Sequence, residues 1–186
     1  MIAHLFNHSM AWFGITTHQR ILDTFRIVYR QPIVEIFLIS CFLFQAFSGV
    51  KLIFRLRKKE EKSTFEKVQI YSGVILGLFI IQHITATIGQ RFYFGFDTNF
   101  YFASRVVLQD PIKWFFIPYY ILGIMSFATH IANVHQHKMI LRIGEKQARI
   151  HFWTIISIST IVTTLILFIF MGGRFEIIIP KAYIIY

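Results

Sequence analysis

The sequence predicts an all-α integral membrane protein, a bundle of four transmembrane helices in one domain over residues 1–186. Three observations predict it: 55% of the residues are hydrophobic, 22 of the 186 are Phe, and the apolar residues gather in four long runs. A soluble domain of this length does not need so many large apolar side chains, whereas about 20 consecutive apolar residues cross a ~30 Å hydrocarbon layer. The predicted spans are residues 33–54, 68–90, 112–136 and 151–171.

The two ends of the chain are predicted to lie outside these spans. Residues 1–15 are apolar and are predicted to form a short helix, which reaches only about 20 Å and is too short to cross a bilayer. Residues 16–30 are polar and basic and lead to Gln31-Pro32, where Pro favours the first turn of a helix. The fourth apolar run stops at Gly172-Gly173, and we expect the tail, residues 172–186, to be an interfacial or subunit-contact segment.

The net charge of +10 is concentrated in two short loops, residues 55–67 and 138–149. Short loops rich in Lys and Arg face the cytoplasm or the mitochondrial matrix. The loop over residues 91–110 has two Arg and two Asp, as an outer loop should. The charge therefore predicts topology, and we expect no nucleic-acid partner.

Polar groups inside the predicted spans are few, and the histidines are the candidates for chemistry. His83 stands alone in the second span, His130 begins a polar stripe on the third, and His4 and His8 lie one turn apart in the N-terminal segment. An ionisable side chain inside a membrane helix is a candidate functional group by default. Histidines on separate helices that face a bundle interior are suited to hold haem iron through axial imidazoles.

Depth decides which histidines can share a haem. His83 lies about 12 Å from the outer end of its span and His130 about 27 Å from the outer end of its own, so they cannot bind the same iron. His83 is left with His4 or His8 as its partner, and the sequence leaves that choice open. At the depth of His130 the first span has Gln45 instead of a histidine. The small pair Ser72-Gly73 predicts close packing of a helix or of a porphyrin.

Several short stretches together resemble one known family. In the second span they are Val68, Gln69, Ser72, Gly73, Leu78, Phe79 and His83; elsewhere they are residues 1–6, 32–34, 45–47, 102–107 and 130–133. Their order and spacing resemble the cytochrome b membrane anchor of succinate:quinone oxidoreductases (succinate dehydrogenase and fumarate reductase), in particular the di-haem type with a single anchor subunit. The resemblance covers roughly residues 1–138. It departs from the family in a shortened first helix, in Gln45 at the position of an inner-haem ligand, and in Ala128 where some members carry a carboxylate.

The resemblance implies a subunit outside the catalytic core that anchors a flavoprotein and an iron–sulfur subunit on the cytoplasmic or matrix face. It would link their electron transfer to the membrane quinone pool through haem b, with His83 and either His4 or His8 as axial ligands and His130 as the ligand of a second haem. The loops 55–67 and 138–149 would form the docking surface. The membrane would be the bacterial cytoplasmic membrane or the mitochondrial inner membrane, and a second anchor subunit is left open.

Two other functions fit the same residues. The first is a haem-free structural or assembly subunit of a respiratory complex, in which the histidines form hydrogen bonds between helices. Gln45 and the shortened first helix favour it. The second is a small transporter or channel, which the lack of buried carboxylates and of inverted repeats disfavours.

Overall fold

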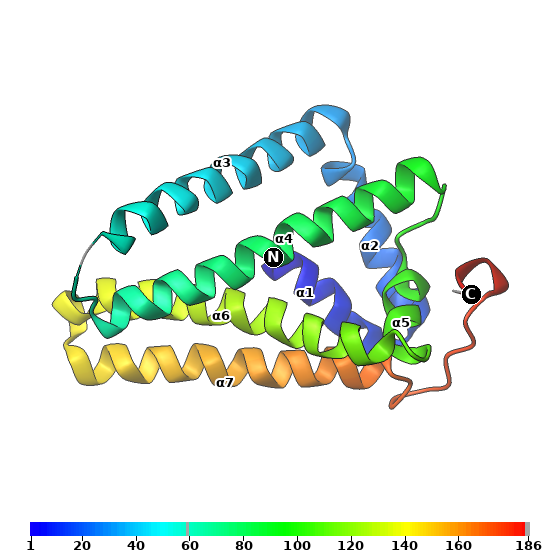
Figure 1. The fold of residues 1–186 in the computed structure, drawn as a ribbon. Helices are drawn as coiled ribbons and strands as arrows, with labels where there is room; N and C mark the ends of the chain where they lie inside the picture. The colour runs from blue at the N-terminus through cyan, green and yellow to red at the C-terminus, as the bar shows by residue number, and fades with distance from the viewer. Residues whose placement is uncertain (59, 185–186) are drawn as a thin grey trace. The chain divides into compact units, whose positions relative to one another are not determined.

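The computed structural model describes residues 1–58 and 60–184, except for the side chains of Leu56 and Arg57. Over these residues the chain forms seven α-helices and two short 3₁₀ helices, with no strand, so the all-α prediction is confirmed (Figure 1). The elements are α1 (Ile2–Ser9), η1 (Met10–Phe13), α2 (Ile15–Tyr29), α3 (Pro32–Arg57), α4 (Thr64–Tyr93), α5 (Phe100–Leu108), α6 (Lys113–Ile143), α7 (Glu145–Phe170) and η2 (Lys181–Tyr183).

Four of the helices, α3, α4, α6 and α7, are long and apolar enough to cross a membrane, as the sequence predicted. Most of their ends extend past the predicted spans; α6, for example, continues from residue 136 to Ile143. The added turns are basic and polar. Lys, Arg and Gln are good helix formers, so the helices continue beyond the apolar stretch. α6 and α7 are separated only by Gly144, whose φ of +80° suits glycine at the turn. One residue of the predicted docking loop, Lys59, lies outside the described residues.

The N-terminal segment is helical, as predicted. α1 and η1 together cover residues 2–13, and the chain turns at Gly14, where φ is +112°. The polar stretch after the turn, for which no element was predicted, is the helix α2. Two of its side chains, His18 and Leu22, are buried. Burial of one face stabilises this helix despite its polar composition.

The described residues pack as two compact units, each built from separate stretches of the chain. The first unit contains residues 1–28, 81–121 and 161–186. Its buried core joins α5 to the last turns of α7 and to η1, and it consists of Ala11, Phe100, Val106, Val107, Ile166, Leu167, Ile169 and Phe170. The tail belongs to this unit as well: the Tyr183 hydroxyl of η2 accepts a hydrogen bond from Asn99, the N-cap of α5, at 2.9 Å.

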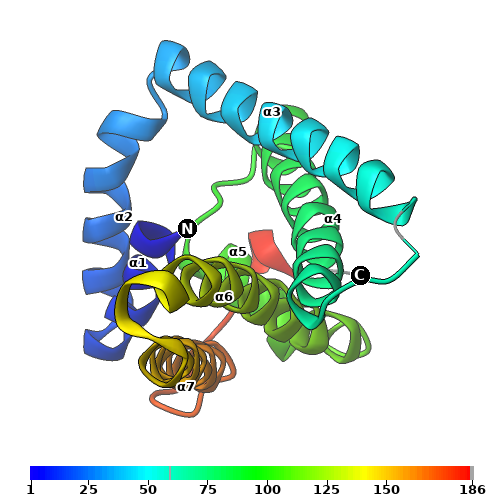
Figure 2. The same cartoon turned by 90° about the vertical axis from the view of Figure 1, so that its left-hand side faces the viewer.

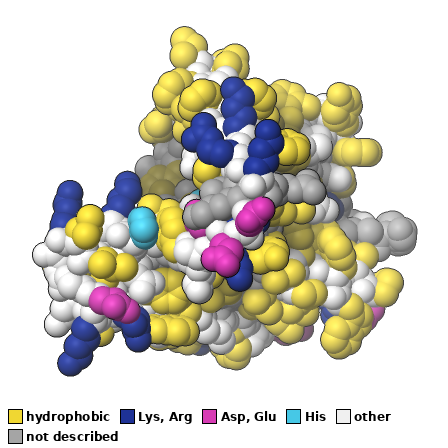
Figure 3. Space-filling model, turned by 60° about the vertical axis from the view of Figure 1, so that its left-hand side comes forward, with side chains coloured by type: hydrophobic (Ala, Val, Ile, Leu, Met, Phe, Trp, Pro, Cys, Tyr) yellow, Lys and Arg dark blue, Asp and Glu magenta, His cyan; other side chains and the backbone are white. Residues whose placement is uncertain are grey.

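The second unit contains residues 29–80 and 122–160. Within it α6 and α7 lie side by side in both ribbon views (Figures 1 and 2). α4 and α6 pack closely at Gly123, where an added Cβ would come within 2.2 Å of the Phe79 ring. Lys and Arg side chains, together with a few carboxylates, gather at one end of this unit (Figure 3).

Candidate functional site

Four histidines meet in the first unit: His4 and His8 of α1, His18 of α2, and His83 of α4. Nε2 of His4 lies 3.1 Å from Nε2 of His8, and Nδ1 of His8 lies 3.1 Å from Nε2 of His18. The ring centres of His4 and His83 are 5.9 Å apart, with an angle of 69° between the rings. We call these four residues the histidine cluster.

Local structure explains how α1 and α2 supply three of the four rings. His4 and His8 are four residues apart, so they lie on the same face of α1. The turn at Gly14 reverses the chain, which brings His18 back against Asn7 and His8. Aromatic side chains close the far side: the His8 ring contacts Phe170 at 5.0 Å between centres, and the His18 ring contacts Phe100 at 5.4 Å.

Burial keeps this part of the cluster uncharged at neutral pH. The His18 side chain is completely buried, and that burial, together with the nearby Arg26, lowers its pKa to about 4, while Asp23 opposes the shift. Burial also lowers the pKa of His8 well below its usual value, and the neighbouring His4 and His18 lower it further. Neutral imidazoles have a lone pair available, which is the state that a metal ligand or a hydrogen-bond acceptor needs.

His4 and His83 come from distant parts of the sequence and contact each other edge to face, with ring centres 5.9 Å apart. Two imidazoles that held one metal ion between them would have their ligating nitrogens about 4 Å apart. His4 is also the more available of the two candidates on α1, because both ring nitrogens of His8 already bond to neighbouring imidazoles.

His130 lies in the second unit and is enclosed by hydrogen bonds from α4. Its Nε2 is 2.9 Å from the Gln69 side-chain nitrogen and its Nδ1 is 3.2 Å from the Ser72 hydroxyl. Since the Gln69 amide donates, His130 carries its proton on Nδ1 and donates it to Ser72. Gly73 gives the ring room, because an added Cβ would lie 3.2 Å from His130 Cε1. The Ser72-Gly73 notch therefore holds the His130 ring.

The remaining histidines lie toward the basic end of the second unit. His135 and His151 pair across α6 and α7, with Nε2 and Nδ1 3.2 Å apart in an exposed position. His137 stacks on Phe65 with ring centres 4.0 Å apart. Within the described residues no group of three or more His, Cys, Asp or Glu side chains is arranged to hold a single metal ion. A porphyrin, which supplies four nitrogens itself, needs only the two axial ligands.

The sequence did not identify His18 or Asn7 as part of the site. His18 lies in a polar, basic stretch, where a histidine is normally solvated. Asn7 lies between His4 and His8, which were the more obvious candidates. One signal in the sequence could have identified both residues. Gly14 predicts a turn, and it lies fewer than ten residues from Asn7 and from His18.

No family model, curated protein or solved structure matches this chain. The resemblance to the anchor subunits of succinate:quinone oxidoreductases therefore stays a prediction from the residues.

Proposed function

We propose that this protein is a membrane-anchor subunit of the succinate:quinone oxidoreductase type that holds one haem b between His4 of α1 and His83 of α4. The observation that carries the proposal is the 5.9 Å separation of these two imidazoles, which come from distant parts of the sequence. Bound haem b would carry single electrons between soluble partner subunits and a membrane quinone. The chain's own share is to bring the two imidazoles together from α1 and α4.

Ligation by His4 requires one local change. Its Nε2 is paired with Nε2 of His8 and would exchange that contact for iron if it is the ligating nitrogen. A hydrogen bond of this kind contributes about 1 kcal/mol, far less than a metal–imidazole bond. The bond between His8 and His18 is unaffected, so the rest of the cluster keeps its geometry.

The proposal is tested by the haem content of the purified chain, measured as pyridine haemochromogen per polypeptide. We expect about one haem for each chain, and loss of that haem in His83→Ala and in His4→Ala. His151→Ala is the matched control, because His151 also pairs with another imidazole but lies in the other unit. Haem lost in His8→Ala and kept in His4→Ala would move the axial ligand to His8.

The second candidate is a haem-free structural subunit of a respiratory complex. The enclosed His130 favours it, because both of its ring nitrogens already bond to α4 side chains. Histidine acts there as a link between two membrane helices, which is the ordinary use of a polar residue in a bundle. A wild-type chain that purifies without haem, although haem is supplied during expression, would favour this function over the first.

The proposed partners are a flavoprotein and an iron–sulfur subunit that dock on the loops 55–67 and 138–149. Exposed cations of these loops support the assignment, among them Arg55, Lys58, Lys138, Arg142, Lys146 and Arg149. Charges of this kind steer a partner of opposite sign and weaken with salt. The triple substitution Lys138→Glu, Arg142→Glu and Lys146→Glu should abolish co-purification of both subunits. Unchanged co-purification would place the docking surface elsewhere.

A further inference from the structure

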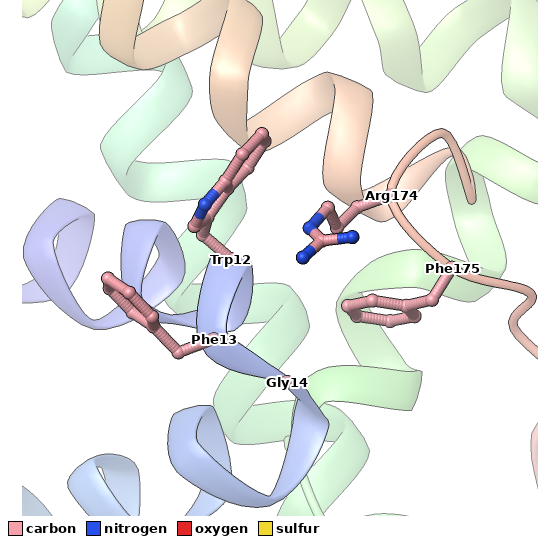
Figure 4. Close-up of a pocket in the computed structure, with 5 residues that line it drawn as sticks. All are labelled: Trp12, Phe13, Gly14, Arg174 and Phe175. Atoms are coloured by element: carbon pink, nitrogen blue, oxygen red, sulfur yellow. The ribbon is translucent and has the colours of Figure 1, made fainter.

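The first unit contains a second feature that the histidine cluster does not involve. A pocket of about 430 Å³ is lined by Trp12, Phe13 and Gly14 on one side and by Arg174 and Phe175 on the other (Figure 4). This volume is within the range of small-molecule sites. The pocket combines aromatic walls with a single cationic side chain.

Both walls are held in place by the core of the unit. Ala11 of η1 is buried in the same cluster as Ile169 and Phe170, so η1 is packed against the last turn of α7. α7 is a candidate membrane span that ends at Phe170. The pocket therefore lies at the end of a span, the level at which Trp and Arg side chains meet lipid head groups.

The turn after α7 delivers Arg174 to the pocket. Gly172 has a φ of +81°, and an added Cβ at Gly173 would come within 2.3 Å of the Phe168 ring. Glycine at both positions allows the chain to turn tightly over Phe168. The backbone N–H of Gly173 donates to the carbonyl of Phe168 at 2.9 Å and fixes this turn.

The guanidinium of Arg174 lies over the Trp12 ring, with 5.1 Å between its carbon and the ring centre (Figure 4). This cation–π contact uses none of the five guanidinium N–H donors in a hydrogen bond. Among the described residues, no hydrogen bond or ion pair engages Arg174, and its side chain is exposed. The contact with Trp12 thus holds the guanidinium beside the aromatic walls, with donors that the protein itself does not use.

We propose that this pocket binds the phosphate of an anionic phospholipid. The guanidinium edge matches phosphate oxygens bidentately, and the rings of Trp12, Phe13 and Phe175 would contact the glycerol and the first acyl carbons. The apolar walls favour a lipid over free inorganic phosphate, which would leave them in contact with a hydrated ion. An anionic lipid is favoured over a zwitterionic one, because the latter carries its own cation beside the phosphate.

The test uses the fluorescence of Trp12 in the full chain. The protein has three tryptophans, so the variant Trp114→Phe/Trp153→Phe leaves Trp12 as the only indole. This protein is reconstituted into phosphatidylcholine vesicles that contain a minor fraction of brominated phosphatidylglycerol, or the same fraction of brominated phosphatidylcholine. Bromine quenches only nearby indoles, so the ratio of quenching by the two lipids measures which one occupies the pocket.

We expect the anionic lipid to be enriched about five-fold next to Trp12, as one basic residue near an anionic head group would produce. Arg174→Gln should return the quenching ratio to one, whereas Lys181→Gln, which removes another exposed cation of the tail, should leave it unchanged. A melting temperature for each variant shows that the fold is retained. Equal quenching by the two lipids, or an equal effect of both substitutions, overturns the proposal, and loss of the enrichment in excess inorganic phosphate would reassign the site to free phosphate.

Discussion

The side-chain nitrogen of Asn7 lies 3.2 Å from Nε2 of His18, and both side chains are buried. An amide N–H can only donate, so in this orientation Nε2 of His18 accepts and the ring is protonated on Nδ1. Nδ1 of His8 lies 3.1 Å from the same nitrogen. Because Nε2 of a neutral imidazole has one lone pair, the Asn7 amide and the His8 ring share it. Asn7 thus sets the tautomer of His18.

Asn7→Leu removes this amide while keeping a similar volume. His18 loses a buried hydrogen bond, so we expect the free energy of unfolding to fall by about 1–3 kcal/mol. Thermal unfolding in detergent measures the loss. Thr17→Val, which removes an exposed side-chain bond from α2 to the Phe13 carbonyl of η1, is the matched control and should change little. Equal melting temperatures for Asn7→Leu and wild type would contradict the role assigned to Asn7.

Stability should depend on pH through His18. Its pKa is about 4 in the folded chain and 6.5 in the unfolded chain, first because of burial and then because of Arg26. The unfolded chain therefore binds more protons as the pH falls, so stability is full above about pH 6.5 and declines until about pH 4. The share of the decline that His18 contributes should reach at most about 3 kcal/mol. His8, whose pKa is also lowered, adds to the decline in the same direction. His18→Gln should therefore make the decline smaller by that share, and an unchanged curve would contradict the role assigned to His18.

The four spans and the all-α class were predictable because each rests on local composition. A run of apolar residues long enough to cross a bilayer can be recognised from the sequence alone, whatever the helix packs against. The ends of the helices were less predictable. α6 runs on to Ile143 and α7 begins at Glu145, because a single glycine suffices for the turn between them. The helix α2 was missed, since its stability comes from burying His18 and Leu22 rather than from its own sequence.

The candidate site was only partly predictable. His4 and His83 were identified because histidines are rare in apolar segments. The pairing of His8 with His18 depends on a turn that the periodicity of the sequence does not predict. At Ser72-Gly73 the sequence predicted close packing of a helix or of a porphyrin and left the choice open. The structure supplies the occupant, because the His130 ring fits where a Cβ on Gly73 would come within 3.2 Å.

Gly123 should be the glycine of the second unit least able to accept a side chain. An added Cβ would lie 2.2 Å from the Phe79 ring, so Gly123→Ala should cost about 1–3 kcal/mol through overpacking of α4 against α6. Gly77→Ala is the matched control: nothing lies within 4 Å of its added Cβ, and alanine is the better helix former by about 1 kcal/mol. Unfolding in detergent should separate the two variants in opposite directions. Equal melting temperatures would mean that the two helices move apart without cost.

His130 should contribute to stability more than to cofactor binding. Gln69 donates to Nε2 of His130 at 2.9 Å and accepts from Asn133 at 3.0 Å, so Gln69→Leu breaks two of the hydrogen bonds between α4 and α6.

We expect Gln69→Leu and His130→Ala each to lower the free energy of unfolding by about 1–2 kcal/mol, in line with hydrogen bonds between membrane helices. The double variant should lose less than the sum, because the two changes remove one shared bond. Haem content, measured in the same preparations, should stay at the wild-type value. A drop in haem content with His130→Ala but not with Gln69→Leu would make His130 an axial ligand, since only the imidazole can bind iron.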